Sequence, residues 1–284
     1  MIRPSNTTEL TAALQLPSLK SQKKVCVPTM GALHAGHIEL IRHARNIAGE
    51  AGCVIVTLFV NPTQFDKPED LENYPQTLNQ DIKTCEKEGV DILFTPSADS
   101  IYYDDHSIII NENSLSKQLC GQTRPGHFDG VCTIVLKLLN ITQADSAVFG
   151  KKDYQQLAII RRLVRDLNIS VQIEGVDTVR EPSGLALSSR NARLTHEQRE
   201  DAARLRQALL LAKQTYQNGE TSTAPLIQIA QDKIEASSLA IKIDYLELLD
   251  AVSLKPINSV DQPAIIAAAV FYDNVRLIDN IEIG

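Results

Sequence analysis

The feature that most constrains the fold of this chain is the regular alternation of apolar runs with helical patterns between residues 24 and 178. The run at 54–60 is rich in Val, Ile and Leu, which is typical of a strand covered on both faces. Strands are predicted at residues 24–27, 53–60, 92–94, 147–149 and 171–176, with helices around 37–49, 76–88, 130–141 and 153–167. This order predicts a parallel sheet with crossover helices, in which ligands bind beyond the carboxyl ends of the strands.

The pattern changes after about residue 180. Thr195 and Gln198 predict a capping box that opens a helix over 196–217. A helix around 224–237 and strands at 241–249, 264–272 and 275–283 follow, with a hairpin turn at Asp273-Asn274. The sequence therefore predicts an α/β protein with a Rossmann-like parallel-sheet domain over 1–178. A smaller C-terminal α+β domain with an antiparallel sheet is predicted over 179–284.

Composition excludes several classes of protein. The chain has 284 residues, 43% of them hydrophobic, and a formal net charge of −7. Nucleic-acid binding depends on clustered Lys and Arg, and no long basic run is present. Neither a membrane-spanning apolar segment nor a signal-peptide pattern is found. Five scattered cysteines without a C-x-x-C pair predict a reduced protein. Together, these features predict a cytoplasmic protein with no nucleic acid or membrane partner.

The stretch from Pro28 to His37 predicts a phosphate site between a strand and a helix. Gly31 and Gly36 remove side chains where a ligand would approach the backbone, and the first amides of a helix attract anions. His34 and His37 are three residues apart, which places both rings on one side of the first turn. The alternatives are a chance H-x-x-H, two structural histidines, or half of a metal site.

Two later segments repeat this chemistry. Residues 149–156 (FGKKDYQQ) again combine a strand end, a glycine and a helix start, and a Lys in such a loop neutralises phosphate. Residues 187–191 (LSSRN) offer two hydroxyls and a guanidinium in a loop predicted to close over substrate at the domain junction. The alternatives are a capped helix with solvated lysines and a Ser-rich linker.

Three further positions are candidates on weaker signals. Gln64 follows the strand stop at Pro62 and presents an amide at the sheet edge, although it is also a plausible ordinary loop residue. Asp81 lies on a predicted helix face and is a candidate magnesium ligand. Residues 124–130 (RPGHFDG) are predicted to form a flexible rim before a helix that starts near Val131.

Taken together and in this order, the segments resemble the pantoate–β-alanine ligase family. H-A-G-H is similar to the HIGH signature of the nucleotidylyltransferase superfamily, and L-S-S-R is similar to the KMSKS loop. The stretches FVNPTQF, GKKDYQQL and LSSRN narrow the resemblance to this ligase.

The resemblance implies a reaction in which ATP and (R)-pantoate form pantoyl adenylate and pyrophosphate. β-Alanine then displaces AMP to give pantothenate. It further implies ATP as a substrate, Mg²⁺, a homodimer, and a first domain that binds nucleotide and pantoate beneath a C-terminal lid. Lys151 departs from the family pattern, where Glu is expected in many relatives, and this affects the expected ATP affinity but not the reaction.

The resemblance also implies a role for each matched residue. The catalytic residues are His34, His37, Lys152 and Arg190. The remaining ATP-binding residues are Met30, Gly31, Ala32, Leu33, Ala35, Gly36, Gly150, Lys151, Asp153, Val179, Leu187, Ser188 and Ser189. Gln64 and Gln156 bind pantoate, and Gln64 also helps to place β-alanine.

Two other functions stay open at this stage. A nucleotidylyltransferase that moves AMP or CMP onto a phosphorylated small molecule would share the H-x-G-H site. A nucleotide-sensing protein without turnover would also bind ATP. The complete set of Lys152, Ser188, Ser189 and Arg190 counts against it, because binding alone would not require a closing cationic loop. A tRNA synthetase relative is disfavoured by the acidic charge balance.

Overall fold

The computed structural model describes residues 1–65 and 68–284, and the chain divides into two compact units. Unit 1 comprises residues 1–116, 121–151 and 156–177. Unit 2 comprises residues 117–120, 152–155 and 178–284. The two short segments of unit 2 come from the part of the sequence assigned to the first domain, so Lys152 packs with the C-terminal elements.

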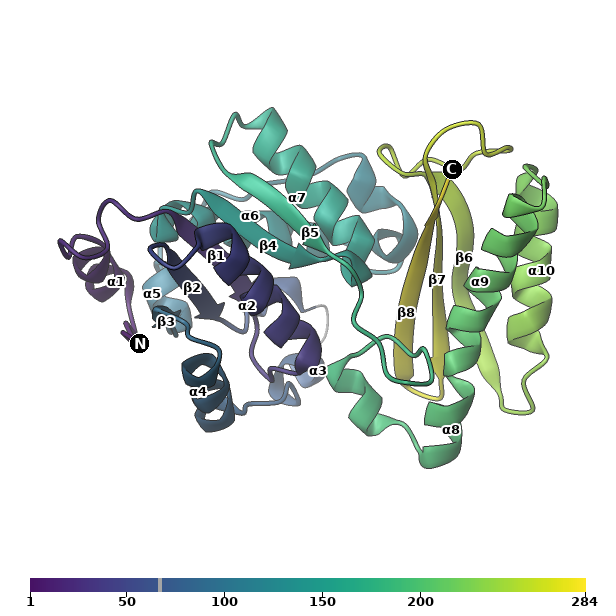
Figure 1. The fold of residues 1–284 in the computed structure, drawn as a ribbon, viewed down its shortest axis with the longest axis horizontal. Helices are drawn as coiled ribbons and strands as arrows, with labels where there is room; N and C mark the ends of the chain where they lie inside the picture. The colour runs from purple at the N-terminus through teal and green to yellow at the C-terminus, as the bar shows by residue number, and fades with distance from the viewer. Residues whose placement is uncertain (66–67) are drawn as a thin grey trace. The chain divides into compact units, whose positions relative to one another are not determined.

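Unit 1 contains a five-stranded parallel sheet with the strand order β3-β2-β1-β4-β5 (Figure 1). The strands are β1 (Lys24–Thr29), β2 (Cys53–Leu58), β3 (Ile92–Phe94), β4 (Ser146–Gly150) and β5 (Gln172–Val176). The order reverses between β1 and β4, and this is where ligands bind in open α/β sheets. The predicted parallel sheet is confirmed, and two of the predicted phosphate segments begin at these two strand ends.

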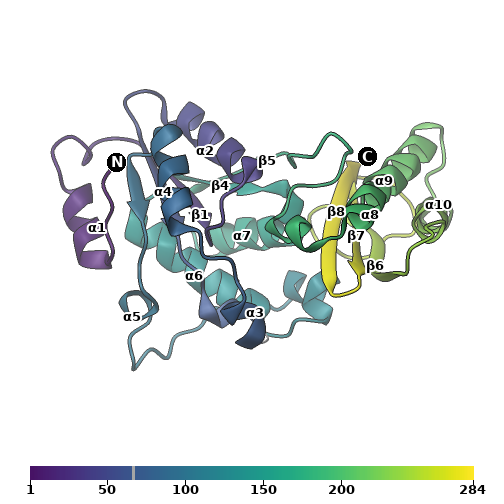
Figure 2. The ribbon, with the colours of Figure 1, turned by 90° about the horizontal axis from the view of Figure 1, so that it is seen from below.

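Helices cover both sides of this sheet. They are α1 (Thr7–Leu14), α2 (Ala35–Ala48), α3 (Pro68–Glu72), α4 (Leu78–Lys87), α5 (Ala98–Ile101), α6 (His127–Thr142) and α7 (Tyr154–Asp166). Val25 and Val27 of β1 share a buried cluster with Ile41 of α2 and Cys85 of α4. Figure 2 shows α2 and α6 on opposite sides of the sheet. Burial on both faces explains the nearly continuous apolar runs of these strands.

Helix α6 begins earlier than predicted. Gly126 adopts a left-handed conformation (φ 78°) before it, and His127 and Phe128 are buried in its first turn. The expected flexible rim at 124–130 is therefore wrong for its second half. Gly130 lies against the short 3₁₀ helix η1 (Pro62–Gln64), where an added Cβ would collide with the Thr63 carbonyl group.

Unit 2 contains an antiparallel sheet in the order β6-β7-β8, covered on one face by α9 and α10 (Figure 1). Its elements are α8 (His196–Asp201), α9 (Ala203–Gln217), α10 (Thr223–Glu235), β6 (Ile241–Asp250), β7 (Ala264–Tyr272) and β8 (Val275–Ile283). The predicted antiparallel module and its capping box at Thr195 and Gln198 are confirmed. The single helix predicted over 196–217 is interrupted at Ala202, whose carbonyl accepts from the Leu205 amide in a three-residue step.

No helix among the described residues is both long and apolar enough to cross a membrane.

The contact between α6 and η1 makes Gly130→Ala a test of how tightly these elements pack. A Cβ at this position collides with backbone atoms, so one element must move, and overpacking of this kind costs about 3 kcal/mol of unfolding free energy. Gly89→Ala is the matched control, because a Cβ there meets nothing within 4 Å and only the left-handed backbone (φ 70°) resists it, at about 1 kcal/mol. Denaturant unfolding measures both losses. An equal or smaller loss for Gly130→Ala contradicts the tight contact.

Candidate active site

The two histidines at the start of α2 cap the helix reciprocally. His34 is the N-cap residue, and its Nδ1 accepts from the Gly36 amide at 3.1 Å. The His37 Nδ1 accepts from the His34 amide at 3.3 Å. This arrangement is a capping box with histidines in place of the usual Ser/Thr and Glu/Gln. The ring centroids are 4.1 Å apart, as the three-residue spacing predicts.

The cap determines which ring atoms carry protons. Each Nδ1 accepts a hydrogen bond, so a neutral ring must carry its proton on Nε2. His34 and His37 are therefore both donors at Nε2. Gly36 is required for this geometry, because a Cβ there would lie 2.8 Å from His34 Cε1. The residue makes room for the protein's own imidazole, which differs from the expectation that it opens the backbone to a ligand.

Asp81 anchors the loop between β1 and α2. Its side chain is 2% exposed, and its oxygens accept from the amides of Ala32 (3.0 Å) and Leu33 (2.8 Å) and from the Thr77 hydroxyl (3.1 Å). Gly31 (φ 88°) and Ala32 (φ 51°) are both left-handed, which turns successive amides toward one anion. The Asp81 carboxylate thus binds the amides of the loop that precedes α2, and the amides of the first helical turn remain the predicted phosphate donors.

The same contacts bear on the proposed metal role of Asp81. Both of its oxygens accept from protein donors, which leaves a poor ligand for a divalent cation. Among the described residues, no group of three or more His, Cys, Asp and Glu side chains is arranged to hold a metal ion. The geometry gives Asp81 the role of loop anchor.

Gln64 lies at the end of η1, and its side-chain amide contacts Met30 and Asn61. Its Nε2 donates to Met30 Sδ at 3.0 Å, and its Oε1 accepts from Asn61 Nδ2 at 3.1 Å. Its main-chain oxygen lies 2.7 Å from His127 Nδ1 and 3.2 Å from Arg124 Nη2. The predicted sites at Met30 and Gln64 are therefore brought together within unit 1.

Gln156 lies half-buried in the first turn of α7. That Gln156 and Gln64 bind pantoate in one pocket remains a prediction.

The two lysines after β4 have different surroundings. Lys151, in unit 1, forms an ion pair with Asp177 at 2.8 Å. Lys152, in unit 2, has a side chain that is 19% exposed and lies 3.8 Å from the Asp153 carboxylate. Asn280 of β8 donates to the main-chain oxygen of Lys152 at 2.9 Å. The Lys152 backbone is thus fixed by a hydrogen bond, and its side chain is partly buried.

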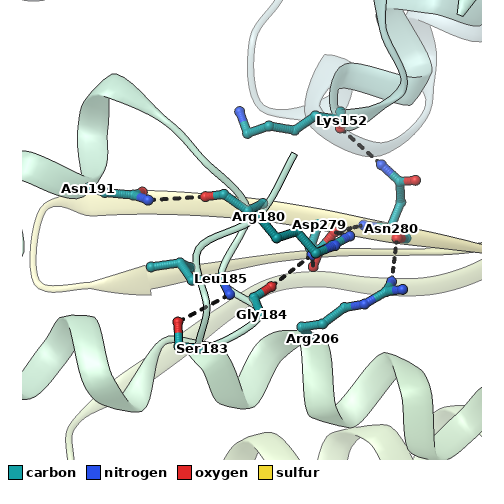
Figure 3. A network of polar contacts seen from close by, with 10 residues as sticks. Lys152, Arg180, Ser183, Gly184, Leu185, Asn191, Arg206, Asp279 and Asn280 are labelled. Atoms are coloured by element: carbon teal, nitrogen blue, oxygen red, sulfur yellow. Dashed lines mark hydrogen bonds and ion pairs between the residues drawn. The ribbon is translucent and has the colours of Figure 1, made fainter. Parts of the chain in front are cut away.

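A polar network in unit 2 surrounds the hydrogen bond between Asn280 and Lys152 (Figure 3). Asp279, 3% exposed, accepts two hydrogen bonds from the Arg180 guanidinium at 2.7 and 2.9 Å. Arg180 also donates to the Gly184 carbonyl, and Arg206 donates to the Asn280 carbonyl at 3.3 Å. Burial, followed by the positive charge of Arg180, lowers the pKa of Arg206. Bidentate pairing of this kind gives a fixed geometry.

The segment that carries Ser188 and Arg190 is held by its own backbone and by Asn191. The Leu187 amide donates to the Val179 carbonyl at 3.0 Å, which brings these two predicted ATP-binding residues together. Ser188 caps the 3₁₀ helix η5 (Ser189–Arg193) by accepting from the Arg190 amide. Asn191, 4% exposed, donates to Glu181 and to the Ala186 carbonyl.

Several supporting residues were not predicted from the sequence. Asn61 lies inside the quoted N-P-T-Q-F stretch but was not singled out, and Tyr102 carries no motif. Asp279 stands in a row of alternate strand positions that is otherwise apolar (Val275, Leu277, Ile281 and Ile283), and this irregularity was the available signal for it. Asn280 stands in the row that also contains Arg276 and Glu282, so it gave no such signal. A charged residue on a predicted buried strand needs a partner, which Arg180 supplies.

The sequence of this chain is similar to known proteins over almost its whole length. The family model for Pantoate-beta-alanine ligase matches residues 4–282. The pantothenate synthetase of Akkermansia muciniphila is 50% identical over 279 residues, which cover 98% of this chain and 99% of the relative. The pantothenate synthetase of Enterococcus faecalis is 47% identical over 254 residues, 89% of either chain.

Solved structures give the same result. The pantothenate synthetase from Thermus thermophilus matches with a TM-score of 0.91 at 38% identity, covering 99% of both chains. The pantoate-β-alanine ligase from Francisella tularensis, solved in complex with beta-gamma ATP and beta-alanine, matches with a TM-score of 0.79 at 37% identity. That match covers 99% of this chain and 97% of the Francisella chain. Because sequence and structure agree from end to end, this chain belongs to the pantoate–β-alanine ligase family.

Proposed function

We propose that this chain catalyses the ATP-dependent condensation of (R)-pantoate with β-alanine to give pantothenate. The observation that carries this proposal is the reciprocal cap of His34 and His37, which fixes two Nε2 donors at the start of α2. Fixed donors suit phosphate oxygens whose charge changes during reaction, because they need no reorganisation as charge develops.

The reaction has two steps, and neither requires a nucleophile from the protein. A pantoate carboxylate oxygen attacks the α-phosphorus of ATP, a new P–O bond forms, and the bond to the β-phosphate breaks to release pyrophosphate. The amine of β-alanine then attacks the acyl carbon, loses a proton, and displaces AMP. The protein's task is to hold two anions close together and to stabilise phosphate charge.

Within this proposal, the residues that bind ATP are those of the matched motifs. His34 and His37 donate to phosphate oxygens, and Met30 to Gly36 form the loop around them. Lys152 and Arg190 supply positive charge, with Ser188 and Ser189 as short donors and Gly150 to Asp153, Val179 and Leu187 as further contacts. Gln64 and Gln156 bind pantoate through neutral amides, which contact its oxygens without adding a charge.

Magnesium enters the proposal with the nucleotide. Mg²⁺ is usually held by substrate phosphates and water with one or two carboxylates, so the lack of a dedicated cage in the described residues fits a nucleotide-borne ion. Bound in this way, Mg²⁺ would neutralise phosphate charge.

We also propose a cytoplasmic homodimer. None of the five cysteines forms a disulfide in the described structure, which suits a reducing compartment.

The homodimer rests on a separate observation. Ile108 and Ile109 are 78% and 66% exposed, and neighbouring exposed apolar residues favour burial by a second copy. Sedimentation velocity of the wild-type chain and of Ile108→Asp tests the assembly, since a charge in the interface should shift the species to monomer.

Isotope exchange between ATP and pyrophosphate tests the reaction itself. We expect exchange only when pantoate is present, followed by AMP release only when β-alanine is added. Folded protein that binds ATP but shows no pantoate-dependent exchange contradicts the proposal and favours nucleotidyl transfer to another acceptor.

Replacement of His37 tests the phosphate donors. We expect His37→Ala to lower kcat by about 100- to 1,000-fold, because a fixed donor to developing charge is lost. His37→Gln should recover part of this loss, since an amide keeps both a cap acceptor and an outward N–H donor. His43→Ala, on the same helix, is the control. Steady-state kinetics with a thermal-denaturation check measure these effects, and near-normal turnover in folded His37→Ala contradicts the assignment.

Replacement of Lys152 separates ATP binding from chemistry. If its ammonium group stabilises the reacting phosphate, Lys152→Ala should lower kcat by about 100-fold even at saturating ATP. Lys255→Ala, an exposed lysine of the same unit, is the control. Full recovery of the rate at high ATP would show that Lys152 acts in binding alone.

A further inference from the structure

The amide of Gln64 belongs to a cluster in unit 1 whose donors and acceptors can be assigned from chemistry. Asn61 is 1% exposed, and one atom of its side-chain amide lies 3.2 Å from the Gly130 carbonyl oxygen and 3.1 Å from the Gln64 amide. A carbonyl oxygen only accepts, so this Asn61 atom must be the nitrogen. The atom of Gln64 that faces it must then be the oxygen.

The other end of the Asn61 amide is held by hydroxyl groups. Its Oδ1 accepts from the Tyr102 hydroxyl at 2.9 Å and from Thr63 Oγ1 at 3.0 Å. Tyr102 is 9% exposed, and burial raises the pKa of its phenol, so the hydroxyl keeps its proton and remains a donor. Rotation of the Asn61 amide by half a turn would place its oxygen against the Gly130 carbonyl, which is repulsive.

The orientation of the Asn61 amide determines the orientation of the Gln64 amide. With Oε1 held by Asn61, the Nε2 group is directed to Met30 Sδ at 3.0 Å. A thioether is a weak acceptor, so an oxygen of a substrate would readily replace it. Because His127 and Arg124 hold the Gln64 carbonyl, the residue is fixed at both its backbone and its amide.

We propose that Tyr102 is a positioning residue for pantoate, which acts through Asn61 to keep the Gln64 amide with its N–H donors toward the substrate. The group bound at Gln64 is therefore an oxygen acceptor, such as a carboxylate oxygen or a hydroxyl lone pair. The identity of the substrate rests on the proposed function, whereas the orientation of the amide does not.

Tyr102→Phe removes the hydroxyl and little else. The ring packs near Phe59 (centroids 6.3 Å apart), His106 (5.2 Å) and the Lys137 ammonium (5.5 Å), and phenylalanine keeps these contacts. Tyr103→Phe is the matched control, because Tyr103 is the next residue in the chain and is 66% exposed.

We expect Tyr102→Phe to raise the KM for pantoate by about tenfold, the effect of one buried hydrogen bond, and to leave the KM for ATP unchanged. Tyr103→Phe should change neither constant. The proposal is overturned if the two variants behave alike, or if Tyr102→Phe shifts both KM values equally, as a general loss of structure would.

Comparison of Gln64→Glu with Gln64→Ala tests the polarity itself, at a pH well above the ordinary pKa of glutamate. Glutamate replaces the outward N–H donors with an anionic acceptor. We expect it to raise the KM for pantoate more than alanine does. A smaller effect of Gln64→Glu would mean that Gln64 accepts from the substrate, and the relay would be wrong.

The side-chain amide signal of Gln64 in ¹⁵N–¹H NMR spectra gives a readout that needs no turnover, and Gln64→Ala assigns it. We expect Tyr102→Phe to shift or broaden this signal and Tyr103→Phe to leave it in place. An unchanged signal overturns the relay. If the signal changes but the wild-type protein shows no pantoate-dependent exchange, the relay holds and the proposed function fails.

Discussion

The reciprocal cap between His34 and His37 is the interaction on which the rest of this site depends. The first turn of a helix exposes amides without partners, and here two imidazole Nδ1 atoms accept from amides at the start of α2. One pair of hydrogen bonds therefore ends the loop, starts the helix and sets the protonation of both rings. The H-x-x-H spacing therefore has a role in the backbone itself, because it places both rings where they accept from these amides.

The same principle recurs around the other predicted site residues. Asp81 holds the loop amides of Ala32 and Leu33, and Asn280 holds the Lys152 carbonyl. His127 contacts the Gln64 carbonyl. In each case the supporting residue binds backbone atoms and so fixes where the functional side chain begins. Fixed geometry of this kind is what a reaction without a protein nucleophile needs, because most of its rate enhancement comes from placing charges and reactants.

Periodicity and turn chemistry were sufficient to predict the parallel sheet, the antiparallel C-terminal strands and the cap at Thr195, since these depend on local sequence. Contacts between distant residues were not predictable in this way. The use of Asp81 as an anchor depends on a left-handed loop whose Ala32 lies 49 positions away from it. Likewise, the start of α6 at His127 follows a left-handed glycine and involves packing against η1. Lys152 contacts β8 through a hydrogen bond from Asn280, which is 128 positions away.

The protonation of the two histidines is the most direct measure of this account. In ¹⁵N-histidine-labelled protein, two-bond ¹⁵N–¹H correlation spectra distinguish the two neutral tautomers, and His34→Ala and His37→Ala assign the signals. The capping geometry predicts that both neutral rings carry the proton on Nε2. A proton on Nδ1 of either ring would contradict the reciprocal cap and the placement of two donors at the start of α2.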